Sequence, residues 1–345
     1  MARARLQDVA ERAGVSIKTV SNVVRDHPQV HVDTRARVQQ AIAELGYRPH
    51  AVGRQLRSGR TGLLALALPE VDIPYYAELA RHVVDAAGGR GHTVLIEQTS
   101  GSLAAERAVL SAREAGLVDG LLLHPVALGA HELAAHALDT PLVLLGEGAA
   151  PASIDHVGID DRAAAGEATR HLLAGGRRRV AFLGVQPAAR ADTSRLRHAG
   201  WADALRAAGL PASPELELPV PEFGFAAGAE AVRAALATGL VFDALLCPSD
   251  LLAVGALSAL AAAGVDVPGR VAVVGFDDIA VAAYTTPGLT SVRLDRQAVA
   301  VAAVELLLER VAGAPDPGRS VRIPHQLVVR GSSAPVSRST EPVEE

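Results

Sequence analysis

Residues 8–24, DVAERAGVSIKTVSNVV, predict two short helices joined by a tight bend. Apolar residues recur at the spacing of one helix face in both halves of this stretch. They are Val9, Ala10 and Ala13 in the first half, preceded on the same face by Leu6, and Val20, Val23 and Val24 in the second. Between them, Gly14 can take the left-handed conformation that ends a helix, and Ser16 can cap the next helix. The pattern is typical of a helix-turn-helix.

The second of these helices has a predicted polar face. If its valines point inward, Ile17, Lys18, Ser21 and Asn22 point outward, in a row short enough to enter a DNA major groove. Lysine can donate to guanine O6 and N7, asparagine can pair with adenine, and isoleucine can contact a thymine methyl group. Lys18 is the only lysine of the chain. The alternative is an ordinary solvated helix face.

Composition and charge indicate a soluble protein with a basic head. A chain of 345 residues, 49% hydrophobic and 21% charged, suits two or three globular domains. Residues 1–60 carry eleven basic against five acidic residues, whereas the other 285 carry 22 against 33. A basic module that meets phosphates, attached to an acidic body, explains this asymmetry, although it could also be a chance fluctuation.

Several classes of protein find no support in the sequence. The single cysteine, Cys247, excludes an intramolecular disulfide and lies in an apolar run, where it is expected to be buried. The N-terminus has no apolar signal region and no stretch reaches about 18 apolar residues, so a cytoplasmic protein without a membrane partner is expected. Nucleotide-binding glycine motifs, HExxH and metal-ligand histidine spacing are all lacking, so we expect no enzyme, cofactor or metal site.

The rest of the chain predicts a third helix, a linker and two α/β lobes. Residues 33–45 form the third helix, Gly46 ends it, and residues 51–57 of the linker could form two helical turns. Beyond the linker, apolar runs predict buried strands at 63–68, 93–96, 120–123 and 142–145, and then at 180–183, 244–247 and 271–274. Helical patterns lie near 78–87, 104–115, 131–138, 163–173, 196–208, 226–237 and 251–263. Ligands of such sheets bind beyond the carboxyl ends of the strands, which makes the cleft between the lobes the candidate site.

Three motifs carry a resemblance to a known family. DVAERAGVSIKTVSNVV, then TRARVQQAIAELGYRP, then QLRSGRTGLLAL resemble the lac repressor (LacI/GalR) family of bacterial transcription regulators, and the likeness continues along nearly the whole chain. The resemblance implies an N-terminal all-α helix-turn-helix head plus an α/β two-lobed, periplasmic-binding-protein-like core of two doubly wound parallel sheets. It also implies three crossovers between the lobes, with the helix at 296–310 returning to the first lobe.

Domain boundaries follow from the same resemblance. The head would span residues 1–48, the hinge helix and linker 49–61, and the effector-binding and dimerisation domain 62–331. Within that domain, lobe 1 would take about 62–160 and 292–320, and lobe 2 about 161–291 and 321–331. The tail, 332–345, is rich in Ser, Pro and Glu without leucine heptads, so we expect it to be disordered.

For DNA, the resemblance implies a homodimer on a palindromic, double-stranded operator. Ile17, Lys18 and Asn22 would select the sequence, while phosphates would be held by Thr19, Ser21 and Arg35. Leu56 of the hinge helix would insert into the minor groove, with paired hinges touching near Val52; the alternative for Leu56 is packing against the first lobe. Gly53 stands where the family usually has alanine, which costs the hinge helix about 1 kcal/mol.

For the effector, the resemblance places a guanidinium and a carboxylate in the cleft, supplied by Arg197 in SRLRHAGW and Asp277 in VVGFDD. Further residues carried over are Tyr75 as a wall, Phe223 as a stacking ring, and the polar pair Ser249 and Asp250. Asp250 is first of all a helix N-cap candidate. Gly146 replaces an aspartate that binds sugar in the lac repressor, which argues against a galactoside effector, although Glu147 could compensate weakly. The alternative for Arg197 and Asp277 is a structural ion pair across a closed cleft, and Trp201 is expected in the core.

Together these features predict a transcription regulator, a repressor controlled allosterically by a small polar effector, with a sugar favoured. A purine-type effector or a protein corepressor remains the alternative within the family. From other classes, the two lobes alone would also suit a solute-binding protein or a sugar-modifying enzyme. Whether the effector releases or strengthens DNA binding stays open.

Overall fold

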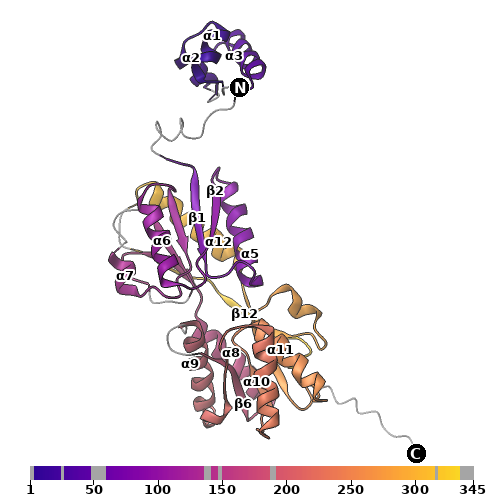
Figure 1. The fold of residues 1–345 in the computed structure, drawn as a ribbon. Helices are drawn as coiled ribbons and strands as arrows, with labels where there is room; N and C mark the ends of the chain where they lie inside the picture. Colours follow the sequence, from indigo (N-terminus) through magenta and orange to yellow (C-terminus); the bar gives the residue numbers. More distant parts are fainter. Residues whose placement is uncertain are drawn as a thin grey trace, which may run out of the picture. The chain divides into compact units, whose positions relative to one another are not determined.

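The computed structural model describes residues 4–24, 27–47, 60–135, 141–146, 150–186, 192–314 and 318–334. The chain divides into two compact units, Met1–Thr61 and Gly62–Glu345. The first contains the helices α1 (Leu6–Ala13), α2 (Ile17–Val24) and α3 (Val32–Leu45) (Figure 1). Most of the linker, with Val52, Gly53 and Leu56, lies outside the described residues.

The core of the head contains five of the seven apolar residues that the sequence pattern marked on its first two helices, and the other two, Leu6 and Val24, pack against it partly buried. Its buried residues are Val9, Ala10, Ala13, Val20, Val23, Val38, Ala41 and Tyr47. Gly14 has φ 64°, the left-handed conformation that lets α1 end and the chain turn. The Oγ of Ser16 accepts a hydrogen bond of 3.1 Å from the backbone N–H of Thr19, so Ser16 caps α2. The predicted helix-turn-helix geometry is therefore confirmed.

The first lobe of the larger unit is a parallel sheet with the strand order β11-β5-β4-β3-β1-β2. These strands are β1 (Leu63–Leu68), β2 (Thr93–Gln98), β3 (Gly120–Leu123), β4 (Leu142–Leu145), β5 (Asp155–Gly158) and β11 (Ser320–Arg322). One face of the sheet is covered by α5 (Pro74–Gly88) and α12 (Arg296–Val311), and the other by α6 (Leu103–Glu114) and α7 (Ala130–Ala135). Alternate residues of β1, such as Leu66 and Ala67, pack into these two separate cores.

The second lobe has the strand order β12-β10-β9-β8-β6-β7. Its strands are β6 (Val180–Val185), β7 (Glu217–Pro219), β8 (Ala244–Leu246), β9 (Ala272–Asp277), β10 (Thr290–Leu294) and β12 (His325–Val328). Its helices are α8 (Asp161–Ala174), α9 (Asp192–Ala207), α10 (Phe225–Ala237) and α11 (Asp250–Ala262), with short 3₁₀ turns η2 (Pro214–Leu216) and η3 (Ala280–Tyr284). The sheet is parallel except that β12 runs antiparallel to β10, a departure from the all-parallel sheet that was expected.

The chain crosses between the lobes three times, after β5, after β10 and after β11, and α12 packs on the first lobe, as the family resemblance implied. The expected boundaries shift slightly. Residues 292–294 belong to the second sheet, because β10 runs to Leu294, and Val321 belongs to the first sheet, where it pairs with Val157. The expected boundaries, at residues 292 and 321, would each cut a strand. The observed boundaries follow the ends of β10 and β11, because the pairing of each strand assigns it whole to one sheet.

Two further expectations are corrected. Strand β2 is exposed along almost all of its length, not buried, because it forms the open edge of the first sheet. The first residues of the segment 332–345, for which disorder was expected, are instead ordered: Ser332 is fully buried, accepts a hydrogen bond from the Thr290 N–H at 2.8 Å and donates to the Val273 carbonyl at 2.6 Å. Residues 335–345 lie outside the described part.

Within the described residues, no helix is long and apolar enough to cross a membrane.

Candidate functional site

Helix α2 presents part of the predicted DNA-reading face. Ile17 is 46% exposed and Lys18 is also exposed, while Thr19 and Asn22 are half-buried. Ser21 is only 8% exposed and therefore does not point outward, contrary to the sequence prediction. Ser21 lies with Val20 and Val23 on the buried side of α2, and the two valines belong to the core of the head. The outward row consequently reduces to Ile17, Lys18 and Asn22.

Arg35 lies at the start of α3. Its Nη2 donates to the backbone carbonyl of His27 at 2.7 Å, which connects α3 to the loop after α2. The side chain of Arg35 is half-buried, and its assignment to a phosphate remains a prediction. The predicted hinge contacts of Val52 and Leu56 lie outside the described residues.

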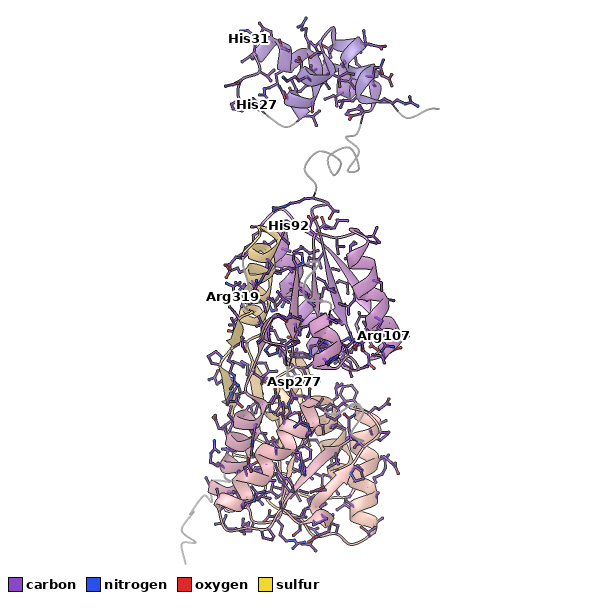
Figure 2. All side chains as sticks on the ribbon, turned by 90° about the vertical axis from the view of Figure 1, so that its left-hand side faces the viewer. His27, His31, His92, Arg107, Asp277 and Arg319 are labelled. Atoms are coloured by element: carbon purple, nitrogen blue, oxygen red, sulfur yellow. The ribbon has the colours of Figure 1, made fainter. Side chains whose placement is uncertain are left out.

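The larger unit contains a cavity of about 440 Å³ between its two lobes. Five of the predicted effector residues line it together: Tyr75, Arg197, Phe223, Ser249 and Asp277. Asp277 lies where the lobes meet (Figure 2). Glu147 falls outside the described residues, and Asp250 is not part of the lining. Because α/β sheets bind ligands beyond the carboxyl ends of their strands, this cavity occupies the expected place.

Arg197 is the buried cation of the cavity wall. It is 4% exposed; its Nε donates to Asp161 Oδ1 at 2.5 Å and its Nη1 to the Pro248 carbonyl at 2.6 Å. The guanidinium also lies 3.6 Å from the ring centroid of Phe276, a cation–π contact. Asp277 Oδ1 is 3.7 Å from Arg197 Nη1. Arg197 and Asp277 both belong to the second lobe, so this ion pair does not span the cleft as the structural alternative supposed.

Asp277 and Asp278 have an unusual backbone at the end of β9. Their φ angles are 105° and 50°, values rarely adopted by residues with a side chain. Arg296 donates to the carbonyl oxygens of both residues, at 3.1 Å for Asp278. Such strained backbone persists only where its surroundings hold it, and it occurs preferentially at ligand sites. The conformation directs the Asp277 side chain to the cavity.

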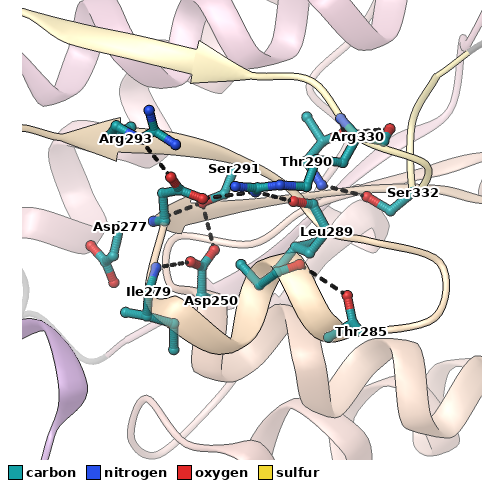
Figure 3. A network of polar contacts seen from close by, with 12 residues as sticks. Asp250, Asp277, Ile279, Thr285, Leu289, Thr290, Ser291, Arg293, Arg330 and Ser332 are labelled. Atoms are coloured by element: carbon teal, nitrogen blue, oxygen red, sulfur yellow. Dashed lines mark hydrogen bonds and ion pairs between the residues drawn. The ribbon is translucent and has the colours of Figure 1, made fainter.

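Asp250 supports this loop from below (Figure 3). Ser249, not Asp250, caps α11, because its Oγ accepts from the Leu251 N–H at 3.1 Å; the N-cap prediction for Asp250 is therefore wrong. Asp250 is fully buried and accepts from the Ile279 N–H at 2.8 Å and from Ser291 Oγ at 2.6 Å. Burial, together with the nearby Asp277 and Asp278, raises the pKa of Asp250 well above its usual value.

Asp278 belongs to a second part of the same network. Its carboxylate pairs with Arg293 Nε at 2.7 Å and with Arg330 Nη1 at 2.7 Å (Figure 3). Arg330 also donates to the Leu289 carbonyl. The network therefore fixes the backbone just after Asp277 from β10 and from the segment that follows β12.

Sequence reasoning missed several residues of the cavity. From the first lobe they include Tyr76, His124 and His156, and from the second lobe Gln186 and Thr193. It also missed Asp161, the partner that fixes Arg197. His124 directly follows β3, so the rule that ligands bind at strand carboxyl ends could have identified it. Asp161 carries no such signal, because its contact with Arg197 depends on how α8 and α9 pack.

The described residues contain no cluster of three or more His, Cys, Asp or Glu side chains able to hold a metal ion. Cys247 is buried, as expected, and burial raises the pKa of its thiol, so it is not a ready nucleophile. Trp201 is fully buried in the second lobe, as predicted, and its indole N–H donates to the Val180 carbonyl at 3.1 Å.

Comparison with known proteins agrees with both units. Residues 5–50 match the model for bacterial regulatory proteins of the lacI family, and residues 169–333 match a periplasmic binding protein-like domain. The transcriptional regulator GalR of Salmonella typhimurium (strain SL1344) is 32% identical over 91% of this chain and 91% of its own length.

Solved structures extend the comparison to the fold. The CelR–cellobiose complex is 31% identical, with a TM-score of 0.71, over 96% of this chain and 100% of that one. The lac repressor dimer bound to operator and the anti-inducer ONPF is 26% identical, with a TM-score of 0.86, over 96% of this chain and 99% of that one. These relatives are regulators of transcription and not enzymes. The chain therefore belongs to the lacI family of bacterial, DNA-binding transcription regulators.

Proposed function

We propose that the protein is a repressor that binds a palindromic operator as a homodimer and is controlled by a sugar bound in the cavity between its lobes. The observation that carries this proposal is the buried Arg197 beside the Asp277 carboxylate at the cavity wall, 3.7 Å apart. An arginine and a carboxylate can donate to and accept from neighbouring hydroxyl groups. Tyr75 and Phe223 supply aromatic surface for the ring of the ligand.

A purine-type effector is the main alternative, because aromatic side chains also stack on a planar base. Two observations favour a sugar. The lining mixes hydrogen-bonding side chains of several kinds, among them Gln186, Thr193 and Ser249. A relative at 31% identity has been solved as a complex with cellobiose. A protein corepressor has no specific observation in its favour.

On the DNA, Ile17, Lys18 and Asn22 would contact base edges, with Thr19 and Arg35 at the phosphates. Ser21 is reassigned from phosphate contact to support of the helix, because it is buried. Leu56 would widen and kink the minor groove at the centre of the site, with the two hinges meeting near Val52. These two hinge roles rest on the family resemblance.

The homodimer is supported by an apolar face on the first lobe. Three hydrophobic side chains there are more than 40% exposed: Val71, Val84 and Ile96. Val84 belongs to α5, and Ile96 belongs to the edge strand β2, on the side of the sheet that α5 covers. Exposed apolar side chains on an open sheet edge favour pairing with another chain, and a two-fold axis would bring the same face of a second copy against it.

The effector test is calorimetry on the full chain with cellobiose, D-galactose and hypoxanthine. We expect a sugar to bind the wild type and to show no binding to Arg197→Ala. Binding of hypoxanthine and of neither sugar would contradict the sugar assignment.

The DNA test selects operator sequences from random duplexes and measures affinity by fluorescence anisotropy with and without the bound ligand. A selected site without two-fold symmetry would contradict the palindromic homodimer.

A further inference from the structure

Gly146 and His124 lie against each other at the carboxyl ends of neighbouring strands. Gly146 directly follows β4 and His124 directly follows β3, and these two strands pair. A Cβ atom built at residue 146 would lie 2.5 Å from His124 Nε2 and 2.8 Å from its Cε1. Contacts this short do not occur for real Cβ atoms, so any side chain at 146 would collide with the imidazole.

The His124 ring has little freedom to move away. The residue is 6% exposed, and its backbone N–H donates to the Ala67 carbonyl at 3.0 Å. The ring packs edge-to-face on Tyr76, with 5.1 Å between ring centroids and 81° between the planes. Displacing the imidazole would therefore disturb α5, where Tyr76 and the cavity residue Tyr75 begin the helix.

A second imidazole holds the other side of Gly146. His156 Nε2 lies 2.6 Å from the Gly146 carbonyl oxygen, a hydrogen-bonding distance that requires this nitrogen to carry the proton. Both His124 and His156 line the effector cavity. Residue 146, where glycine replaces an aspartate according to the family resemblance, thus has one imidazole in the space of the missing side chain and another against its backbone carbonyl.

We propose that His124 is a specificity-determining residue of the effector site, which contacts the ligand from the space that a side chain at 146 would otherwise occupy. This assignment rests on the proposed effector cavity. An ionised carboxylate only accepts hydrogen bonds, whereas a neutral imidazole has one donor and one acceptor nitrogen. At this wall, the ligand can therefore present either a hydrogen-bond donor or an acceptor, whereas a carboxylate would accept only from donors. Residues 124 and 146 act as a coupled pair: removing the ring at 124 removes the collision with a side chain at 146 and leaves only the backbone strain at its φ of 93°.

The spatial half of the proposal is tested without ligand, by thermal unfolding of the full chain. Gly313→Ala is the matched control, because Gly313 has φ 94° against 93° for Gly146 but no atom within 4 Å of a built Cβ. It reports the backbone strain alone. In the wild-type background, we expect Gly146→Ala to lower Tm more than Gly313→Ala does. In the His124→Ala background, we expect the two alanine substitutions to lower Tm by equal amounts. Equal effects of the two alanines in the wild-type background would overturn the pairing.

The recognition half is tested by calorimetry with cellobiose and D-galactose. Loss of one ligand hydrogen bond weakens affinity about tenfold. We expect that weakening for His124→Ala, with most of the affinity restored in His124→Asn, whose amide keeps a donor and an acceptor. A dissociation constant of His124→Ala within twofold of the wild type would overturn the role of His124. If the wild type bound neither sugar, the proposed sugar effector would fail instead, and the thermal cycle would still decide the pairing.

Discussion

Arg296 Nη2 lies 2.8 Å from Glu78 Oε2, an ion pair that connects the segment after β10 with α5 of the first lobe. The same guanidinium holds the carbonyl oxygens of Asp277 and Asp278 in the second lobe. It therefore joins the proposed effector carboxylate to the helix whose first turn carries Tyr75. Through this side chain, the position of the strained loop in one lobe depends on the position of α5 in the other.

The first prediction separates the two connections of Arg296. Arg296→Gln should weaken sugar binding because the backbone at Asp277 loses its support, whereas Glu78→Gln should leave sugar affinity within about twofold. Glu78→Gln should instead bring the operator affinities measured with and without the sugar closer together, since the logarithm of their ratio gives the coupling free energy between the sites.

Arg81→Gln is the control for this prediction. Arg81 also lies on α5, but it is exposed, and its side-chain contacts, a 3.8 Å ion pair with Asp85 and a 3.2 Å contact with His82 Nε2, both stay within the same helix. Calorimetry and fluorescence anisotropy of the three variants provide the measurements. An unchanged affinity ratio in Glu78→Gln would contradict transmission through this ion pair.

The second prediction concerns the pH dependence of stability. Asp155 of β5 has a fully buried side chain that accepts from Arg310 Nε at 2.8 Å and from the Arg319 N–H at 2.6 Å. Burial alone would raise the pKa of Asp155, but the hydrogen bonds from Arg310 and Arg319 outweigh it and lower the pKa to about 2. A folded-state pKa below the unfolded value adds stability at neutral pH that is lost as pH falls from about 4 towards 2.

Asp155→Asn should therefore lower the free energy of unfolding at pH 7 by about 3 kcal/mol, because Arg310 loses its buried partner. The difference between variant and wild type should shrink as the pH falls below about 4, where the wild-type carboxylate begins to lose its charge. Urea unfolding at pH 7, 5, 4 and 3 measures it. Asp85→Asn, at an exposed ion pair, should change stability by less than about 1 kcal/mol at every pH. A difference independent of pH would disprove the electrostatic explanation.

The third prediction concerns a carboxylate that shapes the cavity wall. Glu106 of α6 is fully buried and accepts from the backbone N–H groups of Val126 and Leu128, each at 2.8 Å, and of Ala127 at 3.2 Å. Val126 and Leu128 line the cavity between the lobes, which is the proposed effector site. The side chain of Glu106 therefore holds a segment that would contact the ligand.

Glu106→Gln should lower the free energy of unfolding by about 2 kcal/mol, because the new NH₂ group faces N–H donors and leaves them unpaired. Hydrogen exchange should become faster at Val126, Ala127 and Leu128. Glu132→Gln, which removes a pair of the neighbouring helix α7 with Arg107, should leave exchange of these amides unchanged. Exchange rates equal to wild type in Glu106→Gln would show that the segment is held by other contacts.

Much of the fold could be predicted because it is encoded locally. The predicted bounds of β1, β3 and β4 are the observed ones, since these strands are continuous apolar runs buried on both faces. Strands such as β5 and β11 could not be predicted, because three or four residues that include Asp155, His156 and Arg322 lack a strand pattern. They are strands only because a long-range partner is present: Val157 pairs with Val321, more than 160 residues away.

The candidate site shows the same division. Residues carried by motifs, Arg197 and Asp277, could be placed in the cavity from the sequence. Their supports could not: Asp161 holds Arg197 and Arg296 holds the backbone of Asp277 only through tertiary contacts. The collision between residue 146 and His124 likewise depends on the pairing of β3 with β4. Ser21 was misjudged because helical spacing gives a direction but not the width of the buried face.

The fourth prediction concerns the choice of bases. Lys18 is exposed near the start of α2, so its ammonium group can reach a base edge. Arg35 lies in the first turn of α3, donates to the His27 carbonyl and would contact a phosphate. Lys18→Ala should cost about 1 to 3 kcal/mol on the preferred operator and relax the choice at one base pair of each half-site. Arg35→Ala should weaken all sequences equally and reduce the salt slope by about one per contact. The measurement is anisotropy titration of every single-base operator variant at two salt concentrations. Uniform weakening by Lys18→Ala would place Lys18 on the phosphates instead.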